Sequence, residues 1–145
     1  MLHLGSVYLI ARDMGKAIDF YEKLLEMKVS VKRYDRWAQF DFEGKCLALF
    51  NETFDEKLIS KNKELEKHYN KAYIKYYCEN MIKHGNSTVL NFWVEDLRKE
   101  YERLKLLNIG KLSEIMYINI SSPYYMFVVS DPDGNTIEIT GRYTE

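Results

Sequence analysis

The amino-acid sequence predicts an α+β fold built from two successive β-α-β-β-β modules. A strand-like run followed by an aspartate and a helical apolar pattern occurs twice along the chain, and three short β-type runs follow each time. A glycine turn, at Gly44 and again at Gly134, stands before the last β-type run of each half. The repeat is therefore the main source of the fold prediction.

The first module is expected over about residues 1–50. A β-forming run from Gly5 to Ala11 leads to Asp13, a residue type that caps helix N-termini. The next apolar residues have the spacing of one helix face: Met14, Ala17, Ile18, Tyr21, Leu24 and Leu25. The three β-type runs that follow are residues 28–33, 36–42 and 45–50, with a turn at Glu43-Gly44.

The second module, over about residues 87–145, has the same order. The strand-like run 87–94 leads to Asp96 as the cap, and the helix is expected to bury Leu97, Tyr101, Leu104 and Leu107. Its β-type runs are residues 113–120, 124–130 and 136–140. In the last turn, Pro132 suits the second position of a type I turn and Gly134 accepts a left-handed conformation.

Between the modules lies a segment of about residues 51–86 that belongs to neither. It is rich in Lys, Glu and Tyr, and its apolar residues have roughly helical spacing. A structureless loop of this length is unusual inside a compact domain, so one or two amphipathic helices are expected. They are interpreted as a cover over the sheet, with a lid or a dimer contact as the alternative.

Length and composition describe a single domain, residues 1–145, with enough apolar residues for a core. The net charge of -1 argues against a nucleic-acid partner. The two cysteines, Cys46 and Cys78, form no spaced metal motif. The N-terminal run lacks a basic segment and no apolar run has the ~20 residues of a membrane span, so a cytoplasmic location is expected.

Two segments resemble a known family. The closing run Ser130 to Ile139 (SDPDGNTIEI) and the opening run Tyr8 to Leu25 are similar to the glyoxalase/bleomycin-resistance/extradiol-dioxygenase group, the vicinal-oxygen-chelate superfamily. The resemblance implies a cup of curved mixed sheet with the helices outside, completed within one chain or across a homodimer. Glu26 stands where the family often has glycine, which predicts a left-handed helix end there.

The resemblance also implies four positions for the ligands of a divalent metal ion. They correspond to Ser6, Ala48, Val89 and Glu138, of which only Glu138 is a strong ligand. The histidines at positions 3, 68 and 84 lie outside these positions and are expected on the surface. The prediction is therefore that the protein holds no metal and no cofactor.

Strand alternation then predicts which side chains line the cup. In the hairpin strands of both modules the assignment assumes a three-residue turn, as at Pro132 to Gly134, and a change of register would move these side chains to the other face. The alternative is that these side chains form ordinary core or a subunit contact, with Glu138 paired to Arg36. The predicted ligand-binding residues are Tyr8, Arg36, Phe40, Phe50, Asn91, Trp93, Tyr124, Met126 and Glu138.

This lining predicts a protein that binds or sequesters a planar, cationic or amine-bearing small molecule without converting it, so no catalytic residue is assigned. The first alternative is a metal-dependent lyase, isomerase or transferase of the glyoxalase I or fosfomycin-resistance type, or a dioxygenase-like enzyme. The second is a non-catalytic interaction module. The expected partners are the small molecule and a second copy of the chain, with no nucleic acid and no membrane.

Overall fold

The computed structural model describes residues 7–61, 65–69, 71–79, 84–85, 88–119 and 123–144. The chain divides into two compact units. Unit 1 comprises Met1–Ile18 and Lys28–Lys83, and unit 2 comprises Asp19–Met27 and His84–Glu145. The first helix therefore contributes its N-terminal part to unit 1 and its C-terminal part to unit 2. The single domain expected from length stays a prediction.

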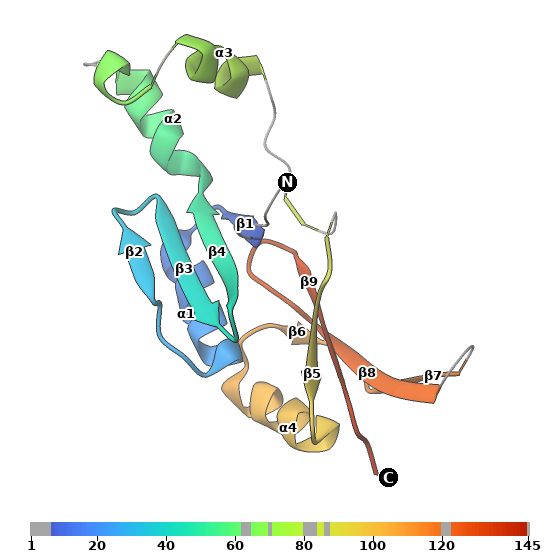
Figure 1. Ribbon diagram of the computed structural model, residues 1–145. Helices are drawn as coiled ribbons and strands as arrows, with labels where there is room; N and C mark the ends of the chain where they lie inside the picture. Colours follow the sequence, from blue (N-terminus) through green and yellow to red (C-terminus); the bar gives the residue numbers. More distant parts are fainter. Residues whose placement is uncertain are drawn as a thin grey trace. The chain divides into compact units, whose positions relative to one another are not determined.

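Unit 1 contains a four-stranded sheet in the order β1-β4-β3-β2 (Figure 1). Strand β1 runs parallel to β4, while β3 is antiparallel to both β4 and β2. The elements are β1 (Val7–Ala11), α1 (Met14–Leu25), β2 (Val31–Arg33), β3 (Trp37–Phe42), β4 (Lys45–Asn51), α2 (Glu52–Lys61), the 3-10 turn η1 (Leu65–Lys67) and α3 (Lys71–Glu79).

Unit 2 contains a second mixed sheet in the order β5-β9-β8-β6, in which β7 also pairs with β8 (Figure 1). Strand β5 is parallel to β9, and β8 is antiparallel to β9, β6 and β7. The elements are β5 (Leu90–Val94), α4 (Leu97–Leu107), β6 (Lys111–Leu112), β7 (Met116–Asn119), β8 (Pro123–Ser130) and β9 (Thr136–Gly141).

The α+β class and the two β-α-β-β-β modules are confirmed, since each module forms a sheet whose first strand lies parallel beside its last. Of the run predicted over 113–120, residues 116–119 form β7, and β6 at 111–112 precedes the predicted run; the two strands pair with different parts of β8. Helices α2 and α3 confirm the helical character of the insert in its described part. The role of the insert and the homodimer stay predictions.

Most of the core of each unit follows from strand alternation and one face of a helix, whereas Ala48 and Met126 are buried on the other face of their sheets. In unit 1 the buried apolar residues are Leu9, Ala11, Met14, Ala17, Ala38, Phe40, Leu47, Ala48 and Leu49. In unit 2 they are Phe20, Tyr21, Leu24, Leu97, Leu104, Met126, Phe127, Val129, Ile137 and Ile139. None of the helices in the described residues is both long and apolar enough to cross a membrane.

Both predicted helix caps are present. The Asp13 carboxylate accepts a hydrogen bond from the Lys16 backbone N–H, and the Asp96 carboxylate accepts one from Lys99, each at 3.0 Å. The hydrogen bond from Lys16 is also the main reason that the pKa of Asp13 is lowered. Glu26, just after α1, has a φ of 54°, which confirms the left-handed helix end predicted for a residue other than glycine.

Candidate functional site

The register of β3 differs from the one expected. The turn between β3 and β4 has only two residues, Glu43 and Gly44, both with positive φ, so Phe42 pairs with Lys45. Phe40 therefore pairs with Leu47 on the core face and is 0% exposed. The prediction that Phe40 shares a face with Tyr8 is wrong, because the expected assignment required a three-residue turn.

The open face of the unit 1 sheet carries Trp37 instead. The ring of Tyr8 lies 5.4 Å from that of Trp37 and 6.2 Å from that of Phe50, measured between centroids. Tyr8 and Phe50 thus lie together as predicted, and Tyr8 is 54% exposed. Trp37 was missed by the sequence reasoning, although a Glu-Gly pair between β-type runs is a signal for the two-residue turn that places it there.

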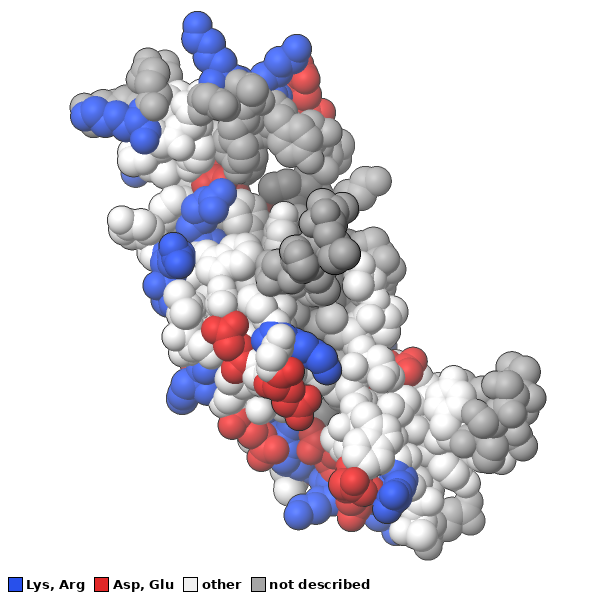
Figure 2. Space-filling view, viewed as in Figure 1, with Lys and Arg blue, Asp and Glu red and all other residues white. Residues whose placement is uncertain are grey.

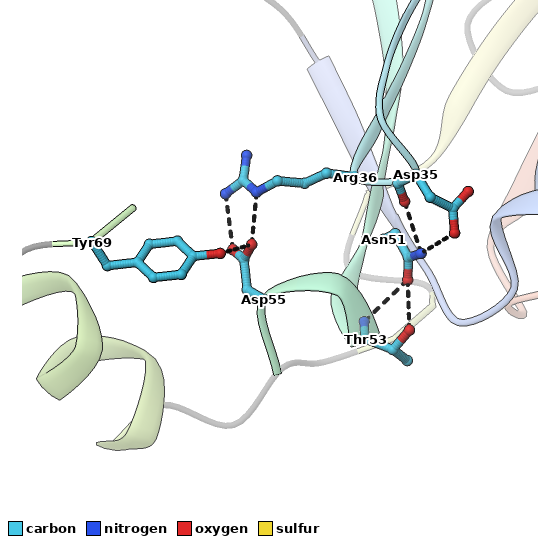
Figure 3. Close-up of polar contacts among 6 residues, drawn as sticks. All are labelled: Asp35, Arg36, Asn51, Thr53, Asp55 and Tyr69. Atoms are coloured by element: carbon cyan, nitrogen blue, oxygen red, sulfur yellow. Dashed lines mark hydrogen bonds and ion pairs between the residues drawn. The ribbon is translucent and has the colours of Figure 1, made fainter. Parts of the chain in front are cut away.

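Arg36 does not line an open pocket; it fastens helix α2 to the sheet of unit 1 (Figure 3). Its Nε and Nη2 donate to the two carboxylate oxygens of Asp55 at 2.7 and 2.9 Å. Asp55 is 0% exposed and also accepts a hydrogen bond of 2.7 Å from the Tyr69 hydroxyl. The guanidinium stacks 4.8 Å from the centroid of Phe50. Arg36 therefore has a structural task that the sequence did not indicate.

Asn51 completes this attachment of the insert (Figure 3). Its side-chain amide donates to the backbone carbonyl of Asp35 at 2.8 Å, and its side-chain oxygen accepts from the backbone N–H of Thr53 at 3.1 Å. Because Asn51 directly precedes α2, this second bond caps the helix start. The insert is thus joined to the sheet of unit 1 by partly buried polar contacts.

The open face of the unit 2 sheet has the register expected from the sequence. Glu138 pairs with Asn91 and Val128, and Thr140 pairs with Trp93 and Met126. Paired residues on neighbouring strands point to the same side. Tyr124 is two residues from Met126 on β8 and so lies on that side too. The structure therefore places five of the predicted residues on one face: Asn91, Trp93, Tyr124, Met126 and Glu138.

Glu138 is held by an amide on this face. The Asn91 side-chain Nδ2 donates to the Glu138 carboxylate at 2.7 Å and lies 3.5 Å from the Thr140 hydroxyl. Within the described residues of unit 2, no basic side chain pairs with this carboxylate. Trp93 and Tyr124 are 57% and 40% exposed, while Met126 is buried. Figure 2 shows few charged atoms over β8, in contrast with the mixed charges around α4.

A hollow of about 570 Å³ lies where β5 and β9 end and β8 begins. Four aromatic residues line it (Trp93, Tyr124, Tyr125 and Tyr143), together with Thr140, Gly141 and Arg142. Its volume falls in the range of small-molecule sites. Gly141 allows the close approach of β5, since a Cβ there would lie 2.4 Å from the backbone oxygen of Val94. This hollow was not foreseen from the sequence.

Comparison with known proteins settles the family. The model of the Glyoxalase/Bleomycin resistance protein/Dioxygenase superfamily matches residues 2–139. The chain belongs to this superfamily. Comparison with curated protein sequences gives no match.

Solved structures of this glyoxalase superfamily share the fold. The chain is similar to the lactoylglutathione lyase from Agrobacterium tumefaciens, at a TM-score of 0.64 and 17% identity over 96% of this chain and 92% of that one. It is also similar to a glyoxalase-related enzyme from Fulvimarina pelagi, at a TM-score of 0.65 and 16% identity over 98% of this chain and 89% of that one. For a glyoxalase/bleomycin resistance protein/dioxygenase from Nocardioides the TM-score is 0.65 and the identity 16%, over 97% of this chain and 83% of that one.

The residues at the four positions where the sequence resemblance predicts metal ligands do not suit a divalent ion. Ala48 and Val89 have no donor atoms in their side chains, which leaves Glu138 as a single strong ligand where about three are needed. Ser6, the fourth position, lies outside the described residues. Among the described residues there is no group of three or more His, Cys, Asp or Glu that could hold a metal. No step through a metal is therefore derived.

Proposed function

We propose that the open face of the unit 2 sheet captures a planar small molecule that carries an amine or another cationic group, and releases it unchanged. The observation that carries this proposal is Glu138: its carboxylate is on the same sheet face as Trp93 and Tyr124 and accepts a hydrogen bond of 2.7 Å from the Asn91 amide. No basic side chain in the described part of unit 2 neutralises it. A ligand cation would do so.

The Glu138 carboxylate shares its sheet face with the apolar side chains of Trp93 and Met126. A charge next to apolar surface loses part of its hydration, and one neutral amide donor replaces only part of what is lost. A ligand ammonium at Glu138 would form a charge-assisted hydrogen bond, which is about twice as strong as a neutral one. The site therefore favours a cationic group over a neutral one.

Trp93 supplies the surface for the planar part of the ligand. It pairs in the sheet with Thr140, two residues along from the Asn91–Glu138 pair, so Trp93 and Glu138 are neighbours on one face of the sheet. Tyr124 lies on the same side of β8. Stacking and cation–π contacts on exposed rings contribute about 0.5–1.5 kcal/mol each, so several of them combine to give micromolar to millimolar capture.

Chemical conversion is not part of the proposal, because the donor set at the metal positions is reduced to Glu138. The similar solved structures include a lactoylglutathione lyase, and this likeness concerns the fold. The bound molecule is accordingly expected to leave as it entered.

Calorimetry with 2-naphthylmethylamine tests the proposal. The wild type is expected to bind, Glu138→Gln to lose about tenfold in affinity, and Trp93→Ala to lose a similar factor, since a tenfold loss corresponds to about 1.4 kcal/mol, the upper part of the range given above for one contact. Glu102→Gln, an exposed acid on α4, is the matched control and should bind as the wild type does. Equal affinity in all four proteins would contradict the proposal. So would turnover of a glutathione hemithioacetal that depends on added Zn²⁺ or Ni²⁺.

A further inference from the structure

The open face of the unit 2 sheet has a charged group at each end. The Asn91–Glu138 pair stands on one side of the Trp93–Thr140 pair, and Glu95 and Arg142 follow on the other side. Residues 138, 140 and 142 succeed one another at every second position of the same strand and its continuation. A strand rises about 3.3 Å per residue, so the Cα atoms of Glu138 and Arg142 lie roughly 13 Å apart.

Among the described residues that line the hollow, Arg142 carries a charge. Its ion pair is with Glu95, at 3.5 Å between Nη1 and Oε2, and both side chains are largely exposed, at 80% and 72%. An exposed pair of this kind contributes little to stability, and the guanidinium can readily exchange it for another carboxylate. The guanidinium is therefore available to an anion that enters the hollow.

The backbone that carries Arg142 is held in place. Its carbonyl accepts a hydrogen bond of 2.9 Å from the Leu97 N–H at the start of α4. The hydroxyl of the next residue, Tyr143, accepts a hydrogen bond of 3.1 Å from the Arg98 Nη2. The Arg98 guanidinium also lies 5.1 Å from the centroid of the Tyr143 ring. The cation thus stands on a fixed segment, which limits the conformational entropy lost when a ligand binds.

We propose that this hollow receives the carboxylate of the ligand whose amine contacts Glu138, so that the molecule is an aromatic zwitterion with its two charges at opposite ends of one ring system. The ring lies on Trp93, between the two charged groups. An α-amino acid, in which both charges sit on one carbon, would not reach both. The inference rests on the proposed function and defines its ligand class more closely.

Glu95 has a definite part in this arrangement. It forms an ion pair with Arg142 and would compete with the incoming carboxylate. A guanidinium binds a carboxylate through two parallel N–H donors, so the ligand and Glu95 use the same donors. Removing Glu95 should therefore strengthen the binding of a carboxylate-bearing ligand, and removing Arg142 should weaken it.

Three probes test the inference: 2-naphthylmethylamine, 2-naphthoate and 6-(aminomethyl)-2-naphthoate, which carries both groups. The wild type is expected to bind the third about tenfold more tightly than the first. Arg142→Gln should abolish this difference while leaving the affinity for the plain amine unchanged. Glu95→Gln should raise the affinity for 6-(aminomethyl)-2-naphthoate several-fold and leave the affinity for 2-naphthylmethylamine unchanged. Lys99→Gln, an exposed cation on α4, is the matched control.

The two proposals fail in different ways. Suppose that 2-naphthylmethylamine binds with an affinity that depends on Glu138, but that the added carboxylate does not raise the affinity and Arg142→Gln does not change it. The proposal of a zwitterionic ligand is then wrong, and the proposed cation site at Glu138 is retained. If 2-naphthoate alone binds through Arg142 and the amine does not bind, the proposed function is wrong. Opposite responses to Arg142→Gln and Glu95→Gln cannot result from loss of folding, because both variants remove one partner of the same exposed pair.

Discussion

The hydroxyl of Tyr21 donates a hydrogen bond of 2.9 Å to the carboxylate of Asp131, although the two residues lie 110 positions apart. Asp131 also accepts from the backbone N–H groups of Asp133 and Asn135, at 2.9 and 2.7 Å. One buried carboxylate therefore shapes the turn between β8 and β9 and joins it to the part of α1 that belongs to unit 2.

Replacing Tyr21 with Phe should remove this bond and leave the packing nearly intact. Tyr21 is fully buried, so Asp131 would lose a donor that water cannot easily replace. We expect the free energy of unfolding to fall by about 1–3 kcal/mol, measured by urea denaturation. Tyr117→Phe, at an exposed position on β7, is the control and should change it by less than about 0.5 kcal/mol. Equal stabilities would mean that the bond contributes nothing.

The same pair predicts a dependence on pH. Burial, and then the charge of Asp131, raise the pKa of Tyr21 far above its ordinary value of 10.0. A group whose pKa is higher in the folded state stabilises it fully below the unfolded pKa, and this contribution decreases as the pH rises above about 10. The stability difference between wild type and Tyr21→Phe should thus be constant from pH 7 to 9 and shrink above pH 10. A constant difference up to pH 11 would contradict this.

The contact between Arg36 and Asp55 leads to a second prediction. In Arg36→Met the carboxylate of Asp55 would stay buried with Tyr69 as its remaining donor among the six residues of this network. Leaving a buried charge without its cation costs about 3–5 kcal/mol, and less here because the Arg36 side chain is partly exposed. We expect a loss of about 2–3 kcal/mol in the free energy of unfolding.

The double variant Arg36→Met with Asp55→Leu is the matched test of the cause. It removes the buried charge together with its partner and should recover much of the stability, since a buried ion pair can be replaced by apolar residues at little cost. If the double variant is as unstable as the sum of the two single variants, the loss comes from packing and not from the unpaired charge.

A third prediction concerns two glycines that differ in their surroundings. Gly85 and Gly134 both have positive φ, 72° and 85°, but a Cβ at Gly85 would lie 2.8 Å from the backbone oxygen of Gly134, whereas one at Gly134 would meet nothing within 4 Å. Gly134→Ala should therefore cost about 1–2 kcal/mol, the penalty of the left-handed conformation alone. Gly85→Ala should cost clearly more in thermal or urea unfolding. Equal losses would show that residues 84–85 do not pack against the turn.

Local signals explain what the sequence predicted correctly. The caps at Asp13 and Asp96 and the turn before β9 depend on a few neighbouring residues, so their chemistry is readable from the chain. Asn91, Trp93 and Glu138 share one face because side chains alternate between the two faces of a strand, and paired residues of neighbouring strands point to the same side.

Long-range partners explain what the sequence did not reveal. Arg36 was considered as a partner of Glu138, yet its ion pair is with Asp55 in the insert, whose position the repeat does not determine. Tyr21 was expected as an ordinary core residue, and its bond to Asp131 depends on how the chain folds back. The hollow beside Arg142 also requires β8, β9 and the C-terminal segment to be placed together.

The error at Phe40 gives the last prediction. A single residue of difference in the turn at Glu43-Gly44 exchanges the two faces of β3, so Phe40 is in the core and Trp37 is on the open face. Phe40→Ala should then lower the free energy of unfolding by about 3–5 kcal/mol, the cost of a large cavity in a core. Trp37→Ala should cost clearly less, because that side chain is only half-buried, packs against Tyr8 on one side and leaves no enclosed cavity. Urea denaturation of both variants decides the matter: a larger loss for Trp37→Ala would mean that β3 has the register first expected from the sequence, with Trp37 in the core.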